Sequence, residues 1–370
     1  MKIAEPGIVF KGTAGTRTAI ACFPSLAVLS DGTVLATFSV ASRKNAADTR
    51  VFMSRSEDGG RTWSNPEEPF PGPYKGIAEA AHVAHITEVG SGRLLAAVLW
   101  VDHSDPSLPF FNPETEGLLP VINLLAESRD GARTWSSVWE APQVFDGPAT
   151  PTGPIHKLRD GTLVLPLEVN KPYDDPSPWH QRSACQYSTD GGRTWPDYAI
   201  VASDPARRMY YWDRRCCVLR DGSVLSMFWV FDSRKGEDLT IHHSLSPDGR
   251  IWPAPEDTGV VGQVIYPAEL PDGRILGTYV DRYVTRTVRV CLSDDQGKSW
   301  DAAGELVLYE KERPTAGVGD SETTTEYLQE MGLWSFGLPC VCILPDGIGL
   351  ALYYAGSEDA TNIYWARIEV

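Results

Sequence analysis

One short motif, Ser-x-Asp-x-Gly-x-Thr-Trp, recurs along this chain of 370 residues and constrains its fold more than any other feature. Two copies, at 56–63 and 188–195, are intact. Ala132 replaces the glycine in the copy at 128–135, Ser299 replaces the threonine in the copy at 293–300, and a shortened copy stands at 246–252. A repeat of roughly fifty to seventy residues predicts a fold in which each unit buries its apolar face against its neighbours.

The residue types of this motif are those of a hairpin corner. The aspartate can accept hydrogen bonds from amides of the turn, the glycine can adopt a positive φ, and the tryptophan can pack between adjacent sheets. We therefore expect the repeated residues to hold the units together and to touch no substrate.

A second repeat, an Asp-Gly or Ser-Gly turn between two short strands, occurs six times. The turns stand at 31–32, 91–92, 160–161, 221–222, 272–273 and 346–347. A third strand follows each turn, and in the first five units it leads into the corner motif and a fourth strand, which describes a four-stranded antiparallel blade. Six such units predict an all-β, six-bladed β-propeller that occupies residues 1–370 as a single domain. Because the sixth unit ends after its third strand, we expect residues 3–10 to supply the missing strand and close the ring.

The composition limits the classes of partner. A net charge of −16 without any basic run argues against nucleic-acid binding. The chain has no run of eighteen apolar residues and no leader-like N-terminus, so we expect no membrane partner and a cytoplasmic location, or a secreted one if a signal peptide has been removed. Seven cysteines in apolar strands suggest reduced thiols, and no metal or cofactor motif is present. The oligomeric state is left open.

With these motifs the chain resembles, from end to end, the sialidase (neuraminidase) superfamily, whose six-bladed propellers carry this corner motif, called the Asp box or BNR repeat. The resemblance implies the propeller fold and a carbohydrate substrate. It says less about activity, because Asp boxes also occur in other glycosidases, in polysaccharide lyases and in non-enzymatic modules.

Counting from the Asp-Gly turns shows where this chain departs from the superfamily. The resemblance places two arginines that clamp the substrate carboxylate at Cys22 and Trp229, and it places the nucleophilic tyrosine at Leu338. Each charge-assisted contact to a carboxylate contributes roughly 1.5–3 kcal/mol, so the loss of two should weaken binding of sialic acid by about two to four orders of magnitude. We therefore expect a substrate other than ordinary sialosides.

Other positions keep groups that the superfamily uses. The glutamate partner of the tyrosine falls on Asp213, an arginine after the second strand of the first unit is matched by Arg43, and Asp48 lies near the place of the acid/base aspartate. The third clamp arginine has three candidates in the fifth unit, which are Arg282, Arg286 and Arg289.

The segments before the six turns should face the channel mouth of the propeller, and they hold the candidate site residues. Asp213 is the strongest of these, and Arg215 would share its face on an extended strand, although a structural ion pair is an alternative role. His82 and His85 would point to opposite faces unless a bulge intervenes, so we expect at most one to face the channel. Further candidates are Glu79, Glu168 at the end of a second strand, Gln263, and the run Asp281-Arg282-Tyr283.

Three functions are consistent with these residues. The first is a glycoside hydrolase with two catalytic carboxylates among Asp213, Asp48 and Glu168. Its substrate-binding residues would be Arg43, His82, Arg215, Gln263, Arg282 and Tyr283. The second is a uronate polysaccharide lyase in which His82 or His85 and Tyr283 move protons, and the third is a carbohydrate-binding propeller without catalysis.

Overall fold

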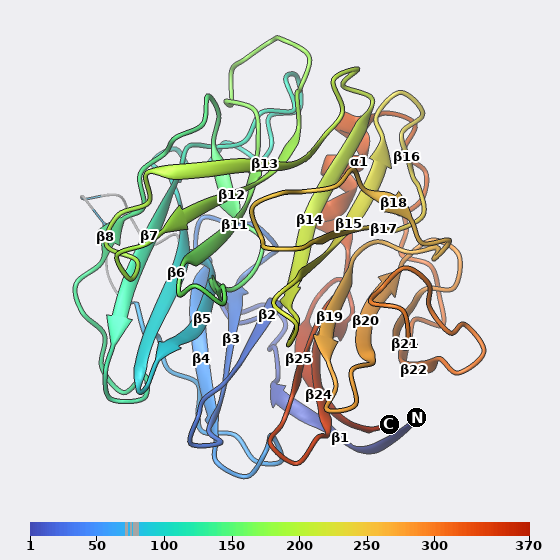
Figure 1. The fold of residues 1–370 in the computed structure, drawn as a ribbon. Helices are drawn as coiled ribbons and strands as arrows, with labels where there is room; N and C mark the ends of the chain where they lie inside the picture. Colours follow the sequence, from blue (N-terminus) through green and yellow to red (C-terminus); the bar gives the residue numbers. More distant parts are fainter. Residues whose placement is uncertain (71–72, 75, 77–80) are drawn as a thin grey trace.

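A computed structural model describes residues 1–70, 73–74, 76 and 81–370 of the chain. Six antiparallel sheets follow one another around the molecule in chain order, which confirms the all-β, six-bladed propeller (Figure 1). One candidate of the second unit, Glu79, lies outside the described residues.

The blades are formed by consecutive segments of the chain. The first blade contains β2 (Ile20–Val28), β3 (Val34–Ala41) and β4 (Arg50–Ser56), and the second contains β5 (Ala81–Gly90), β6 (Arg93–Val101), β7 (Val121–Ser128) and β8 (Trp139–Glu140). The third contains β9 (Ala149–Pro151), β10 (His156–Lys157), β11 (Leu163–Val169), β12 (Arg182–Ser188) and β13 (Asp197–Ser203). The fourth contains β14 (Met209–Val218), β15 (Val224–Asp232), β16 (Glu237–Asp238), β17 (His242–Ser246) and β18 (Glu256–Asp257). The fifth contains β19 (Ile265–Glu269), β20 (Ile275–Asp281), β21 (Thr287–Ser293) and β22 (Leu306–Glu310).

The sixth blade joins the two ends of the chain. It contains β23 (Phe336–Ile343), β24 (Gly349–Gly356), β25 (Thr361–Glu369) and the N-terminal strand β1 (Lys2–Phe10), which pairs antiparallel with β25. Figure 1 shows the blue N-terminal strand lying against the red C-terminal strands. The expected closure of the ring by the two termini is therefore confirmed.

The number of strands in a blade varies from three to five instead of the expected four. In the first blade, a single bridge between Met53 and Glu67 stands beside β4 in place of a fourth strand. The short strands β9 and β16 add a fifth strand to the third and fourth blades. The sequence also did not predict the one helix of the described chain, α1 (Thr324–Glu330), which precedes a 3₁₀ turn (Met331–Leu333) between the fifth and sixth blades.

The corner motif forms a closed set of hydrogen bonds. In the copy at 188–195, Asp190 accepts bonds from the Ser188 hydroxyl at 2.8 Å, and from the Thr194 amide at 2.9 Å and hydroxyl at 2.6 Å. The Trp195 indole is fully buried and donates to the Gly192 carbonyl at 3.1 Å. Arg93 of the preceding blade donates to the Gly191 carbonyl at 2.8 Å, so the motif ties neighbouring blades together.

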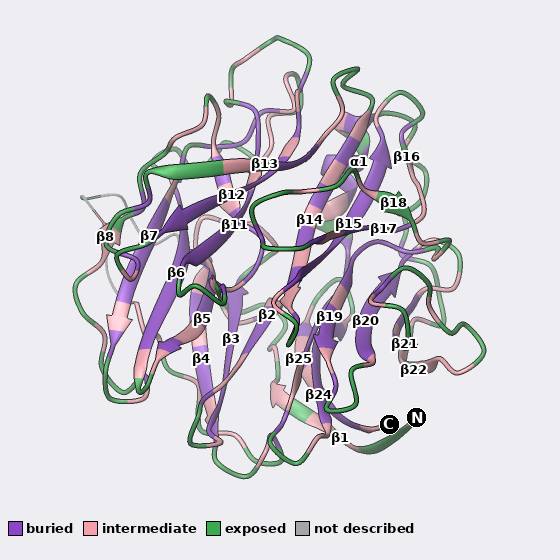
Figure 2. Ribbon diagram, in the orientation of Figure 1, coloured by how far each residue is buried: buried purple, intermediate pink, exposed green. Residues whose placement is uncertain are grey.

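Apolar side chains fill the space between the blades. All residues of β3 and β15 are buried, and the second strands of the blades are largely purple in Figure 2, whereas the loops are green. A middle strand is covered on both faces by neighbouring blades, which explains why these strands read as continuous apolar runs. In the part of the chain that the structure describes, no helix is long and apolar enough to cross a membrane.

Candidate active site

Three innermost strands break their regular pairing at the same place in the repeat. The register shifts lie between Cys22 and Ser25 in β2, between Trp212 and Arg215 in β14, and between Gly337 and Cys340 in β23. At each bulge one residue adopts a positive φ, and it stands eight residues before the aspartate of the Asp-Gly turn. These residues are Phe23 (φ 52°), Asp213 (φ 47°) and Leu338 (φ 38°). A bulge turns a side chain out of the ladder, and all three residues line one axial pocket. Of the three, only Asp213 can ionise.

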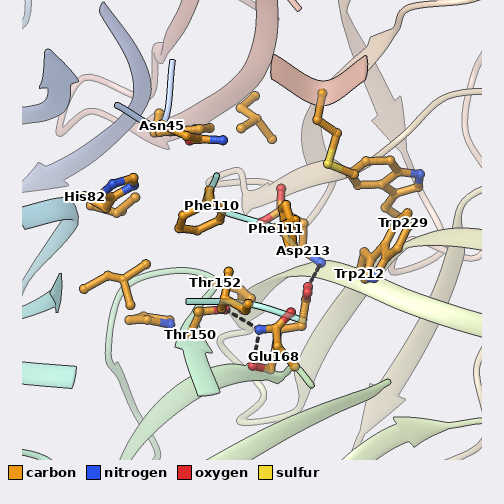
Figure 3. Close-up of a pocket in the computed structure, with 18 of the residues that line it drawn as sticks. Asn45, His82, Phe110, Phe111, Thr150, Thr152, Glu168, Trp212, Asp213 and Trp229 are labelled. Atoms are coloured by element: carbon orange, nitrogen blue, oxygen red, sulfur yellow. Dashed lines mark hydrogen bonds between the residues drawn. The ribbon is translucent and has the colours of Figure 1, made fainter. Parts of the chain in front are cut away.

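The axial pocket has a volume of about 200 Å³ and a largely aromatic wall. Figure 3 shows Trp212 and Trp229 on one side of Asp213, and Phe110 and Phe111 on the other. The polar side chains that line it are Lys44, Asn45, His82, His85, Thr150, Thr152, Glu168, Asn170, Asp213 and Arg215. Leu338 and Trp229, which the count from the Asp-Gly turns placed at the expected nucleophile and clamp positions, also line the pocket.

Glu168 and Asp213 are in direct contact in this pocket. The backbone N–H of Asp213 donates to Glu168 Oε2 at 2.7 Å (Figure 3). Arg215 Nη2 lies 2.7 Å from Asp213 Oδ1, and the two side chains are 11% and 21% exposed, respectively. Arg215 also donates to the Thr152 carbonyl, whereas Arg214 points away and bonds to the thiols of the third and fourth blades. The pocket therefore holds one carboxyl group beside an ion pair.

The two carboxyl groups differ in their electrostatic surroundings. Burial raises the pKa of Glu168 to about 8, although the hydrogen bond from the Asp213 N–H opposes this rise. Burial also raises the pKa of Asp213, but the guanidinium of Arg215 beside it opposes this effect. The ion pair with Arg215 therefore favours the ionised form of Asp213, whereas burial favours the protonated form of Glu168.

The two histidines both line the pocket, which is the exception that the sequence allowed for a strand with a bulge. A register shift between Ala81 and Val83 in β5 supplies the bulge that this arrangement requires. His82 Nε2 lies 3.1 Å from His103 Nε2, and its ring stacks on Phe110, whereas His85 Nδ1 lies 2.9 Å from the Ser25 hydroxyl. Burial lowers the pKa of both His82 and His85 to about 3, so both rings are neutral at physiological pH.

Two predicted residues of the first blade lie outside the axial pocket. Asp48 accepts bonds from the Ser42 amide at 3.2 Å and hydroxyl at 2.9 Å, so its carboxylate stabilises the loop after β3 and is not part of the pocket lining. Arg43 is exposed and lines an adjoining groove. The structure thus brings Glu168 together with Asp213 and separates Asp48 from both.

Gln263, Arg282 and Tyr283 line a second, separate cavity of about 850 Å³. The buried Arg282 donates to the Phe336 carbonyl at 3.1 Å and to Gln263, and its guanidinium lies 4.0 Å from the centre of the Trp334 ring. The Tyr283 hydroxyl donates to Glu330 Oε1 of α1 at 2.7 Å. Trp334 also lines the axial pocket, so Arg282 packs against a wall of that pocket, and its charge acts to lower the pKa of Asp213.

The structure also shows polar residues at the site that the sequence did not reveal. Asp238 accepts bonds from the Trp229 indole at 2.6 Å and the Tyr327 hydroxyl at 2.8 Å, and burial raises its pKa to about 7. Lys44 Nζ donates to the Met331 carbonyl at 2.8 Å and to the Tyr354 hydroxyl at 3.2 Å, which fastens the segment after α1 over the pocket. The pattern Thr323-x-x-Glu326 is a capping box that could have predicted α1, whereas no sequence signal marked Asp238.

The described residues contain no group of three or more His, Cys, Asp or Glu side chains placed to hold a metal ion. All seven cysteines are free thiols, and five of them are buried.

No protein-family model matches the sequence, and no curated protein matches it. Several solved structures share its fold. A protein of unknown function from Dyadobacter fermentans DSM 18053 aligns with a TM-score of 0.76 at 18% identity, over 100% of this chain and 99% of that one. The Hadza microbial sialidase Hz136 aligns with a TM-score of 0.68 at 17% identity, over 99% and 68% of the two chains. The intramolecular trans-sialidase from Ruminococcus gnavus aligns with a TM-score of 0.67 at 12% identity, over 98% and 97%. These likenesses show that the chain shares the six-bladed propeller fold of these sialidases.

Proposed function

We propose that this protein is a glycoside hydrolase that acts in the axial pocket on a glycoside other than the ordinary sialosides. The observation that carries the proposal is the contact between Glu168 and Asp213, in which one carboxyl group favours its protonated form and the other is paired with Arg215. Two carboxyl groups with different proton affinities are the usual requirement for hydrolysis of a glycosidic bond.

The geometry suggests a role for each group. Glu168 would donate its proton to the oxygen of the leaving group as the bond from that oxygen to the anomeric carbon breaks. The Asp213 carboxylate would either attack the anomeric carbon or take a proton from the water that attacks it, and the separation of the carboxyl groups around a bound sugar decides between these routes. Arg215 acts as a positioning residue, because it holds the Asp213 carboxylate in place.

The polar lining supports a substrate other than sialosides. Lys44 and Arg215 are the cations among the described residues that line the axial pocket, and Arg215 is already paired with Asp213. Leu338 lines the pocket where the superfamily carries its nucleophilic tyrosine. An arginine clamp for a carboxylate therefore has no counterpart in the described lining.

The two other functions find less support in the geometry. The lyase hypothesis needs a histidine near Tyr283, but His82 and Tyr283 line different cavities. Binding without catalysis is compatible with the aromatic wall, since aromatic rings stack on sugars, but it gives no reason for a buried pair of carboxyl groups. An assay for hydrolysis of a bound glycan distinguishes binding without catalysis from the hydrolase hypothesis.

The test is a screen of aryl glycosides and oligosaccharides for product, followed by variants of the carboxyl groups. On a substrate that the screen identifies, Glu168→Gln and Asp213→Asn should lower kcat/KM by about 10²- to 10⁴-fold. Asp197→Asn, an exposed site on β13, is the matched control, and Asp48→Asn tests the remaining candidate; both should keep the activity of the wild type. Full activity of Asp213→Asn would refute the proposal, and glycan binding without turnover in the wild type would favour the non-catalytic alternative.

A further inference from the structure

We propose that the groove beside the axial pocket is a second subsite, which binds the leaving-group side of the substrate and selects a sugar that carries a carboxylate or sulfate. The role of this subsite in turnover rests on the proposed function, but its affinity for an acidic sugar does not. The groove has a volume of about 540 Å³ and is formed by the loop after β3, the loop after β6 and the segment from α1 into the 3₁₀ turn.

The groove adjoins the axial pocket. Five residues line both spaces, namely Lys44, Asn45, Phe110, Phe111 and Leu328. Figure 3 shows Asn45, Phe110 and Phe111 together on the side of the axial pocket away from Trp212 and Trp229. A ligand chain that fills one space can therefore extend into the other.

The volumes of the two spaces indicate which part of the substrate each one would hold. The axial pocket, at about 200 Å³, lies below the ~300–1,000 Å³ of sites for drug-sized ligands, so it suits a single terminal sugar unit. The groove is larger, and its rim carries two exposed side chains, Leu108 and Leu333. If the terminal unit enters the pocket beside Glu168, the remainder of the chain is the leaving group and lies in the groove.

The charge of the groove points to an acidic ligand. Arg43 and Lys44 line it, and no aspartate or glutamate occurs among its described lining residues. This is unexpected for a chain with 49 acidic and 33 basic residues. Arg43 is exposed and forms no ion pair with any residue that the structure describes, and both hydrogen-bond acceptors of Lys44 Nζ are uncharged. A bound anion would provide the negative charge that no described lining residue of the groove provides for Arg43 and Lys44.

The acidic residues on the neighbouring loops are engaged elsewhere. Asp48 bonds to Ser42, Asp102 accepts from the Ser104 amide at 2.9 Å, and Asp105 accepts from the Ser107 amide at 3.0 Å. These carboxylates stabilise their own turns and do not line the groove. The groove also offers a ring for stacking, because Phe110 and Phe111 meet edge to face with centroids 4.9 Å apart. Cations beside an aromatic surface match an acidic sugar better than a neutral one.

The test measures binding by isothermal titration to the full chain, both wild type and Glu168→Gln. The probes are tri-galacturonate, an O-sulfated galactan oligosaccharide and, as the neutral reference, galactotriose. At least one acidic probe should bind about tenfold more tightly than galactotriose, and its affinity should fall as the salt concentration rises. The acidic probe that binds identifies carboxylate or sulfate as the preferred group.

The variant Arg43→Gln, at an exposed position, should weaken binding of that acidic probe about tenfold and leave galactotriose unaffected. Arg17→Gln is the matched control, because Arg17 is exposed and lines neither space. The inference is overturned if neither acidic probe binds more tightly than galactotriose, or if Arg43→Gln behaves like Arg17→Gln. If an acidic probe binds as expected but Asp213→Asn keeps full turnover, the catalytic pair is refuted and the proposal of the subsite is not.

Discussion

Replacing Glu168 by glutamine should stabilise the protein by an amount that grows with pH. Burial raises the pKa of Glu168 from 4.5 to about 8 in the folded chain, so the folded state binds this proton more tightly than the unfolded state does. The proton on Glu168 therefore contributes fully to the free energy of unfolding below pH 4.5, the ordinary pKa of the group. This contribution is lost as the pH rises toward about 8, the pKa in the folded chain. Between these values, the wild type should lose up to about 1.4 kcal/mol per pH unit relative to the glutamine variant.

From pH 5 to pH 7 this difference amounts to as much as about 3 kcal/mol. In a chain of this length we expect the melting temperature of Glu168→Gln to rise, relative to the wild type, by about 3–6 °C over the same interval. Glutamine keeps an oxygen that can accept the bond from the Asp213 N–H, so the variant should retain the local structure. Thermal unfolding followed by circular dichroism at several pH values measures the effect.

The control for this experiment is Glu57→Gln, at an exposed position in the first corner motif, which should show no such trend with pH. A constant difference in melting temperature between Glu168→Gln and the wild type from pH 5 to 7 would refute the reasoning. So would a wild type that gains stability over the variant as the pH rises.

Four further outcomes are expected. If Glu168 acts as the acid, kcat/KM should fall as the pH rises through about 8, and a pH–rate profile that stays flat to pH 9 would contradict this role. The kcat/KM for a sialic-acid aryl glycoside should stay well below the roughly 10⁴ M⁻¹s⁻¹ typical of enzymes, and a fluorogenic assay measures it. Trp195→Ala should cost about 3–5 kcal/mol in urea unfolding, because the indole is fully buried between blades. Ala132→Gly should stabilise the chain by about 1 kcal/mol, since Ala132 holds a φ of 67° that suits glycine; equal or lower stability would contradict that account.

The sequence predicted the scaffold because its signals are local. An Asp-Gly or Ser-Gly turn occurs at a fixed place in each blade, and a corner motif follows in the first five. The count of turns therefore gave six blades and left the N-terminal strand to close the ring. The missing fourth strand of the first blade had no such signal, because a single bridge at Met53 replaces it. Helix α1 had a readable cap at Thr323, but the chain around it lacks the repeat that revealed the strands.

The sequence predicted the site residues only where they stand at a fixed distance from an Asp-Gly turn. Asp213 lies in the pocket because the bulge that exposes it stands at the same distance from the turn as those at Phe23 and Leu338. Arg282 and Tyr283 lie elsewhere because the segment between the fifth and sixth blades packs Trp334 and its neighbours across the channel. The place where such an insertion packs depends on contacts between distant residues, and no periodic pattern encodes it.

The measurement that tests the central claim most directly is the dependence of Glu168→Gln hydrolysis on the leaving group. On the sugar that the screen identifies, the variant should keep most of its kcat/KM with a dinitrophenyl leaving group, which needs no proton. It should lose about 10²- to 10⁴-fold with an alkyl or sugar leaving group, which does. Asp213→Asn should lose activity on both substrates, because its carboxylate acts on the anomeric carbon or on water. Equal losses for the two substrates in Glu168→Gln would contradict the assignment of Glu168 as the acid and, with it, the two-carboxylate account of this pocket.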